Sequence, residues 1–200
     1  MNKIVLVYLF LFSFSSIAQR SAFKQLGIAQ KIWVFVHPFK AKIAYQVTQQ
    51  ALAKLDSLSA TKYFEGNLKS GSKADAVRHA YWMVLLSMEI GKRRALKLGK
   101  SYERKNKRDF KKGIVEGSYL PDLVAMQMDL KNNAVGVNIE DSGNANELLA
   151  VVLSFLEQGK LVYIKQNQKG EFLDTNGQII LLEDWSGKWE NDRVVIPTSL

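Results

Sequence analysis

The chain of 200 residues contains no cysteine. Disulfide bonds and thiolate metal ligands are therefore excluded, so export into an oxidising compartment would add no covalent cross-links. Histidine is almost as scarce, because the sequence holds only His37 and His79, and a zinc site with three histidine ligands is impossible. Glycine-rich phosphate loops, nucleophile elbows, zincin motifs and internal repeats are also absent from the sequence.

Long apolar runs are confined to the amino terminus. Lys3 precedes the apolar segment 4–14, and Ser16 and Ala18 place small residues three and one before a cut after Ala18. The apolar run is shorter than the roughly 20 residues of a spanning helix, and no cysteine follows it to carry a lipoprotein anchor. We therefore interpret residues 1–18 as a cleaved signal peptide and expect a periplasmic or secreted protein without a transmembrane anchor.

Positive charge is concentrated in one segment. The chain has 28 basic and 19 acidic residues, and residues 92–112 alone hold 11 basic residues against Glu103 and Asp109. Such a patch attracts polyanions, so an acidic polysaccharide or an anionic lipid is a candidate partner, with Arg93 and Arg94 as contacts. Nucleic acid fits less well, because a signal peptide directs the protein away from it. A solvated basic helix with no specific partner is the commoner explanation of a single charge run.

The remaining sequence, 47% hydrophobic, predicts one mainly α domain. His37 precedes a proline and should mark a break, Ser72 is a natural N-cap, and Pro121 suits the first turn of a helix. We predict a helical bundle of about five helices over residues 19–159 and a short β-rich extension over residues 160–200 that forms a small β-hairpin. The predicted helices cover residues 40–58, 72–90, 92–112, 121–137 and 144–158, and the β-type runs cover 161–165 and 178–182.

A polar stripe runs along the helix predicted after Ser72. Asp75, Arg78, His79 and Trp82 stand at i, i+3, i+4 and i+7, which places them on one helical face. This mixture is unlike an ordinary core stripe, and tryptophan is costly to leave in water. We therefore expect a polar cluster that is at least partly buried between helices.

The helix predicted after Pro121 repeats this spacing. Its second stripe consists of Asp129, Asn132, Asn133 and Gly136. Two polar faces of equal spacing can pack together, and a glycine would let the two helices approach closely. The coincidence of the two stripes favours a buried polar network.

The chemistry of this centre has several alternatives. His79 can act as a general base or acid that Asp75 or Asp129 orients, or His79, Glu103 and Asp129 can bind a divalent metal, as inward-facing side chains of bundles do. Each residue can instead have a purely structural role as a cap, an ion pair or packing. The candidate catalytic residues are His79, Glu103 and Asp129, and the candidate binding residues are Asp75, Arg78, Asn132, Asn133, Arg93 and Arg94.

Residues 75–82 read Asp-Ala-Val-Arg-His-Ala-Tyr-Trp, and residues 128–136 read Met-Asp-Leu-Lys-Asn-Asn-Ala-Val-Gly. These blocks resemble a bacterial domain-of-unknown-function family that occurs in exported Bacteroidota proteins and in toxin-like proteins. The family pattern is Asp-Ala-x-Arg-His-Ala-x-Trp, then His-Glu, then Met-Asp-Leu-His-Asn-Asn-Ala-Val-Gly. The resemblance covers residues 71–159 and implies no established activity.

Two positions depart from the family pattern. Tyr102 and Lys131 stand where the family has histidines. If those histidines are ligands or bases, the resemblance implies a degenerate site; otherwise His79, Glu103 and Asp129 can still act. The sequence thus leaves three functions open: an exported hydrolase-like domain whose site is either intact or degenerate, a non-catalytic envelope module that binds an acidic polymer or lipid headgroup through residues 92–112, and a purely structural helical domain. It also leaves the oligomeric state open.

Overall fold

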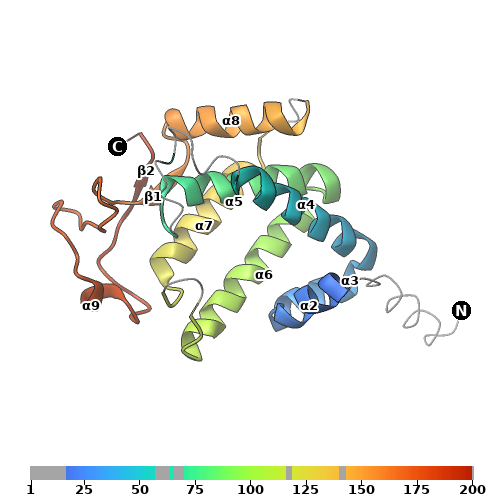
Figure 1. Ribbon diagram of the computed structural model, residues 1–200, viewed down its shortest axis with the longest axis horizontal. Helices are drawn as coiled ribbons and strands as arrows, with labels where there is room; N and C mark the ends of the chain where they lie inside the picture. The colour runs from blue at the N-terminus through green and yellow to red at the C-terminus, as the bar shows by residue number, and fades with distance from the viewer. Residues whose placement is uncertain (1–16, 57–63, 65–69, 116–118, 140–142, 200) are drawn as a thin grey trace, which may run out of the picture.

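The computed structural model describes residues 17–56, 64, 70–115, 119–139 and 143–199, and Figure 1 shows how its helices are arranged. Residues 1–16 of the predicted signal peptide lie outside this part of the chain. The predicted mainly α fold with a small β-hairpin is confirmed, and the described ranges contain more than five helices because residues 17–36 already form two. The elements are α2 (Ile17–Gln25), α3 (Ile28–Val36), α4 (Pro38–Asp56), α5 (Lys73–Ile90), α6 (Lys92–Lys111), α7 (Leu123–Gly136), α8 (Ala145–Glu157), β1 (Val162–Ile164), α9 (Leu182–Trp185) and β2 (Val195–Pro197).

Local signals set most of the helix boundaries. His37 interrupts the helices at φ −129° and ψ 57°, as expected for a residue before proline. The Ser72 side chain accepts a hydrogen bond from the backbone N–H of Asp75 at 3.2 Å and caps α5. Gly91 ends α5 at φ +85°, a conformation that side chains rarely adopt. Asn144 and Glu147 form a capping box at the start of α8.

The start of α7 differs from the prediction. Pro121 was expected in the first helical turn, but the helix begins at Leu123 and Asp122 is its N-cap. The Asp122 side chain accepts a hydrogen bond from the backbone N–H of Ala125 at 2.9 Å, and aspartate is among the best capping residues. Its second carboxylate oxygen pairs with the buried guanidinium of Arg193, so a contact from the far end of the chain also holds this boundary.

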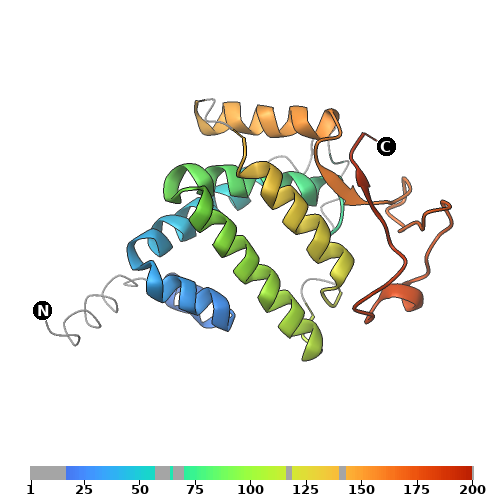
Figure 2. The same cartoon turned by 180° about the vertical axis from the view of Figure 1, so that it is seen from behind.

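Helix α5 is the centre of the molecule. It packs against α4, α6, α7 and α8, which surround it in Figure 2. Its fully buried side chains divide between two apolar clusters, one shared with α4 and α8 and one shared with α3, α4 and α6. A polar side chain on α5 that points toward α7 is therefore enclosed on several sides.

Gly136 sets the spacing between α5 and α7. A Cβ atom at this position would lie 2.3 Å from the carbonyl oxygen of Ala80 and 2.9 Å from its Cα atom. Both distances are far below van der Waals contact. The close helix approach predicted from this glycine is thus confirmed, and it brings the two polar stripes together.

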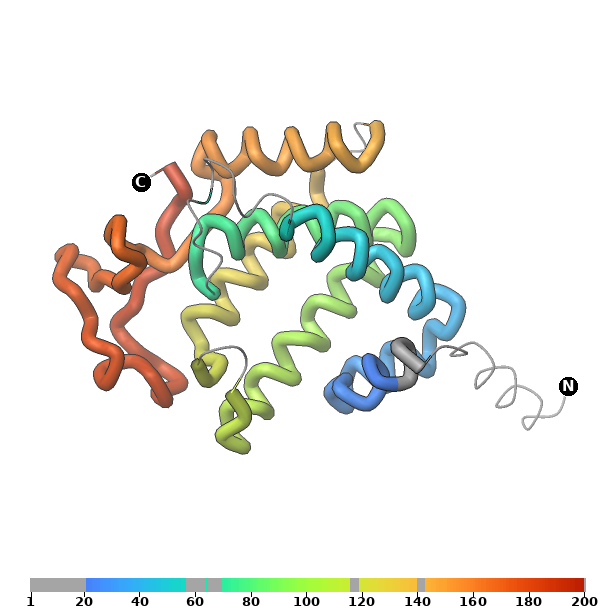
Figure 3. Tube along the Cα trace, viewed as in Figure 1, coloured from blue at the N-terminus to red at the C-terminus, as the bar shows by residue number. Residues whose placement is uncertain are grey.

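The carboxyl-terminal segment is held by contacts that are distant in sequence. Strand β1 pairs antiparallel with β2, whereas the other predicted β-type run, 178–182, contributes to the Leu173–Ile179 bridge and runs into α9. The guanidinium of Arg193 lies 4.5 Å from the ring centre of Phe172 and 3.9 Å from that of Trp185. Figure 3 shows this long connection as an arm beside α7.

Candidate functional site

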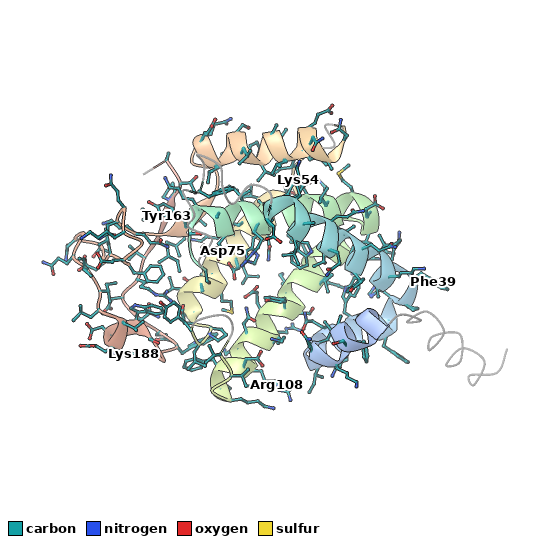
Figure 4. The ribbon with its side chains drawn as sticks, in the orientation of Figure 1. Phe39, Lys54, Asp75, Arg108, Tyr163 and Lys188 are labelled. Atoms are coloured by element: carbon teal, nitrogen blue, oxygen red, sulfur yellow. The ribbon has the colours of Figure 1, made fainter. Side chains whose placement is uncertain are left out.

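The amino-terminal turns of α5 carry the first half of the site. Asp75, which Figure 4 labels near the middle of the molecule, is 2% exposed and accepts a hydrogen bond on Oδ2 from the backbone N–H of Gly71 at 2.7 Å. Its other oxygen, Oδ1, contacts the Arg78 guanidinium at 2.5 Å. Trp82 takes part in the packing instead, and its Nε1 donates to Thr48 Oγ1 at 2.9 Å. The predicted stripe is therefore polar at one end and packed against α4 at the other.

His79 connects the stripe of α5 to that of α7. Its Nε2 lies 3.1 Å from Oδ1 of Asp129 and 3.5 Å from Oδ1 of Asp75. Its Nδ1 lies 3.2 Å from Oδ1 of Asn133. All four residues are buried, so the structure assembles the polar network that the two stripes predicted.

Burial keeps the His79 imidazole neutral. Desolvation lowers the pKa of His79 and outweighs the opposite effect of the Asp75 carboxylate, while Arg78 lowers the pKa further. In the tautomer that carries its proton on Nδ1, this nitrogen donates to the side-chain carbonyl oxygen of Asn133. The lone pair of Nε2 then points toward the carboxylates of Asp75 and Asp129.

Three ligand-type atoms thus converge. Nε2 of His79 and one carboxylate oxygen each from Asp75 and Asp129 all lie within 4.8 Å of one another. A cation about 2.1 Å from each ligand atom requires neighbouring ligand atoms to be about 3.0 Å apart in octahedral and about 3.4 Å apart in tetrahedral coordination. The two separations that involve Nε2, 3.1 and 3.5 Å, are close to these values, and the two carboxylate oxygens lie within 4.8 Å of each other. The three residues can therefore hold a divalent metal ion once the Arg78 guanidinium moves off Oδ1 of Asp75.

Asn132 and Asn133, predicted as a pair of binding residues, have different environments. Asn133 faces His79, whereas the Asn132 amide donates to the carbonyl oxygen of Val162 at 2.8 Å and accepts from its backbone N–H at 3.0 Å. Asn132 therefore joins β1 to α7 as a structural residue.

Glu103 lies outside the convergent group. It is 3% exposed on α6 and accepts a hydrogen bond from Nδ2 of Asn106 at 3.3 Å. Among the described residues, the ligand-type atoms that lie within 4.8 Å of one another come from Asp75, His79 and Asp129, and not from Glu103. Glu103 lies one helical turn after Gly99. A Cβ atom at Gly99 would lie 3.2 Å from Nδ2 of Asn133 on α7, so Glu103 belongs to the face of α6 that packs against α7. The i, i+4 spacing of Asp75 and His79 is the signal that points to Asp75 as a ligand.

The other predicted positions lie at the surface or near it. Lys131 is exposed on α7, and Tyr102 is half-buried on α6. Arg93 and Arg94 are exposed at the amino end of α6, where Arg94 donates to the carbonyl oxygen of Ile90 at 3.2 Å. The structure does not bring Arg93 and Arg94 together with the buried cluster.

A small cavity adjoins the cluster. It encloses about 80 Å³ and is lined by side chains of α4 and α5 together with Phe64. Both Asp75 and Arg78 contribute to its wall, and the Arg78 side chain is 44% exposed. Arg78 therefore stands between the buried carboxylates and solvent.

A family model described as a domain of unknown function, DUF6973, matches residues 31–160. The chain belongs to this family. The match contains α4 to α8 entirely and with them every residue of the cluster. A search of curated proteins and a search of solved structures gave no match, so the argument for the function of this DUF6973 domain depends on its own side chains.

Proposed function

We propose that the DUF6973 domain binds a divalent metal ion through Asp75, His79 and Asp129 and uses it for hydrolase-like chemistry. The observation that carries this proposal is the convergence of an imidazole lone pair and two carboxylate oxygens at separations that suit one cation. Two acids at 2% and 7% exposure are costly to bury as anions, and a bound cation offsets that cost.

The support around His79 is typical of a metal ligand. Metal-binding histidines usually donate their second ring N–H to an oxygen, which fixes the tautomer and the ring orientation. Here Asn133 supplies that oxygen at 3.2 Å. Asn133 is thus a positioning residue in the proposal, and its replacement should weaken metal binding without removing a ligand.

The ligand set narrows the choice of metal. One imidazole and two carboxylates, with no thiolate in the chain, are oxygen and nitrogen donors that suit Zn²⁺ or Mn²⁺ better than soft ions. Three protein ligands also leave coordination positions for water. A metal in such a site lowers the pKa of bound water and supplies a hydroxide nucleophile at neutral pH.

Arg78 has two roles in this proposal. In the absence of a cation its guanidinium neutralises Asp75. When a cation takes over that role, the half-exposed side chain is released toward the cavity, where it can hold an anionic substrate group such as a phosphate or carboxylate.

The two departures from the family's histidine pattern, Tyr102 and Lys131, do not affect the three proposed ligands. Lys131 is exposed, so a histidine at this position would also face solvent and would not join the buried cluster. Tyr102 precedes Glu103 on α6, a helix that supplies none of the three proposed ligands. The ligands Asp75, His79 and Asp129 are therefore compatible with an intact site rather than a degenerate one.

Elemental metal analysis tests the proposal. Protein purified without chelator, or reloaded with Zn²⁺ or Mn²⁺ after dialysis against chelator, should contain one equivalent of metal. His79→Ala and Asp129→Asn should contain less than one tenth of that, because each removes one of three ligands. Lys131→Ala is the matched control on the exposed face of α7 and should bind like the wild type. Absence of stoichiometric metal under all these conditions would contradict the proposal.

Hydrolysis is tested separately. The metal-loaded protein should cleave activated ester or phosphodiester substrates, and the Asp129→Asn variant should lose this activity. Wild-type metal binding without any hydrolysis would retain the metal site and refute the hydrolase-like part of the proposal.

Export is a second part of the proposal, and it rests on the sequence. Lys3, the apolar segment 4–14 and Ala18 favour cleavage by a signal peptidase. Expression in a bacterial host followed by fractionation should give an exported protein whose first residue is Gln19. A chain retained in the cytoplasm with its amino terminus intact would contradict export.

A further inference from the structure

Helix α3 and the start of α4 expose an apolar face. Buried residues of α3 include Trp33 and Val34, which turn toward the core. The opposite face of α3 exposes four side chains spaced as on one side of a helix, and one more is exposed at the start of α4 after the His37 break; each of the five is 59% to 83% exposed. These side chains are Ile28, Ile32, Phe35, Val36 and Phe39. A run of large apolar residues of this length on a surface marks a docking site for another surface.

The basic helix α6 lies directly beside α3. The two helices pack against each other, and a Cβ atom at Gly27 would lie 2.9 Å from Cβ of Lys105. They form the lower part of the molecule in Figures 1 and 2. Ten of the eleven lysines and arginines in residues 92–112 are exposed, whereas both acids, Glu103 and Asp109, are buried. The solvent side of α6 is therefore cationic without interruption.

The segment that carries the apolar face is itself devoid of negative charge. Residues 17–55 contain no aspartate or glutamate, but they contain six lysines and arginines. This distribution argues against a second copy of the chain as the occupant, because two such cationic faces would repel each other. A cationic surface of this kind is complementary to an anionic one.

We infer that the α3 face and the exposed side of α6 dock the protein onto an anionic lipid bilayer. Apolar side chains of α3 enter the boundary between headgroups and acyl chains, and lysines and arginines of α6 contact lipid phosphates. No helix within the described residues is long and apolar enough to cross a membrane, so this contact is peripheral. The inference is independent of the metal site and goes beyond it.

Vesicle co-sedimentation tests the inference with the full chain. Large unilamellar vesicles of phosphatidylcholine are compared with vesicles that also contain phosphatidylglycerol. Binding should require the anionic lipid and should weaken when salt is raised, because screening reduces the attraction between exposed charges. Equal binding to both vesicles, or binding to neither, would overturn the inference.

Two double variants separate the contributions. Phe35→Ser with Phe39→Ser should reduce the partition coefficient on the order of tenfold or more, since two aromatic side chains no longer enter the bilayer. Lys97→Glu with Lys100→Glu should have an effect of similar size. All four residues are exposed, so circular dichroism and thermal melting should remain like those of the wild type.

A charge-matched variant and two alternative outcomes complete the experiment. Lys169→Glu with Lys188→Glu changes the net charge equally on the carboxyl-terminal arm and should leave binding within about twofold of the wild type, because these charges lie away from the docking face. An α3 variant that binds like the wild type would assign membrane binding to residues 4–14 and overturn the inference. A concentration-dependent dimer that the α3 variant abolishes, without vesicle binding, would assign the face to a second copy and also overturn it.

Discussion

Replacing Gly136 by alanine should disrupt both the stability of this domain and its proposed metal site. The added methyl group would lie 2.3 Å from the carbonyl oxygen of Ala80 and 2.9 Å from Cβ of Met83. Since carbon atoms in contact are normally about 3.5 to 4.0 Å apart, α5 and α7 would have to separate by about 1 Å. The obstacle on Ala80 is backbone, so a change of side-chain rotamer cannot relieve the clash.

The same increase in the spacing of α5 and α7 would lengthen the contacts of His79. The His79 ring bridges the two helices, with Nδ1 3.2 Å from Asn133 and Nε2 3.1 Å from Asp129. An increase of about 1 Å in the helix spacing would take both distances beyond hydrogen-bonding range. Overpacking a core contact costs about 1 to 3 kcal/mol. For a chain of this size that corresponds to a decrease of roughly 2 to 12 °C in melting temperature. Metal affinity should fall on the order of tenfold or more, because the orienting contact is lost.

Thermal melting of the metal-free protein and isothermal titration with Zn²⁺ measure the two effects. Gly99→Ala is the graded control, since a Cβ atom there would meet only side chains, Nδ2 of Asn133 at 3.2 Å and Sδ of Met83 at 3.5 Å. It should destabilise the protein less than Gly136→Ala. A Gly136→Ala variant that keeps the wild-type melting temperature and metal affinity would refute the argument that this glycine sets the helix spacing.

Three further predictions concern single contacts. Asn132→Ala should cost about 1 to 3 kcal/mol in urea unfolding, because it removes both hydrogen bonds to the backbone of Val162; an unchanged midpoint would exclude this role. Arg193→Met should lower the free energy of unfolding by about 3 to 5 kcal/mol, because it leaves the buried Asp122 carboxylate without its ion-pair partner. A smaller decrease than that of Asn132→Ala would contradict this prediction. Burial lowers the pKa of His79 below the usual 6.5, so the unfolded chain takes up a proton first and the stability of the metal-free protein should decrease as pH falls below about 6.5. The melting temperature should then vary less between pH 7 and about pH 5.5 in His79→Gln than in the wild type, and equal slopes would refute the assignment.

The elements of the site could be predicted because their signals are local. Ser72 and Gly91 bound α5 through a cap and a positive φ, and neither depends on the rest of the fold. Helical spacing then places Asp75 and His79 on one face. The repeated spacing with Gly136 was enough to predict that α7 would pack against that face, and the structure confirms that it does.

Other features could not be predicted because they depend on contacts between residues far apart in sequence. The sequence did not specify the partner of β1, because β1 and β2 are separated by the long connection that contains α9. The first residue of α7 was wrongly predicted, and its N-cap is Asp122, which also pairs with the distant Arg193. Asn132 and Asn133 are adjacent and chemically identical, and only the position of β1 makes one structural and the other part of the site.

The sequence by itself determined the helical class, the limits of α5 and the two polar stripes, because helix caps and periodicity act over a few residues. Only the tertiary structure decided that Asp75 rather than Glu103 converges with His79 and Asp129. It also placed the apolar face of α3 beside the basic side of α6. Convergence of side chains from different helices depends on helix spacing, rotation and side-chain direction, and these are set by packing across the whole domain.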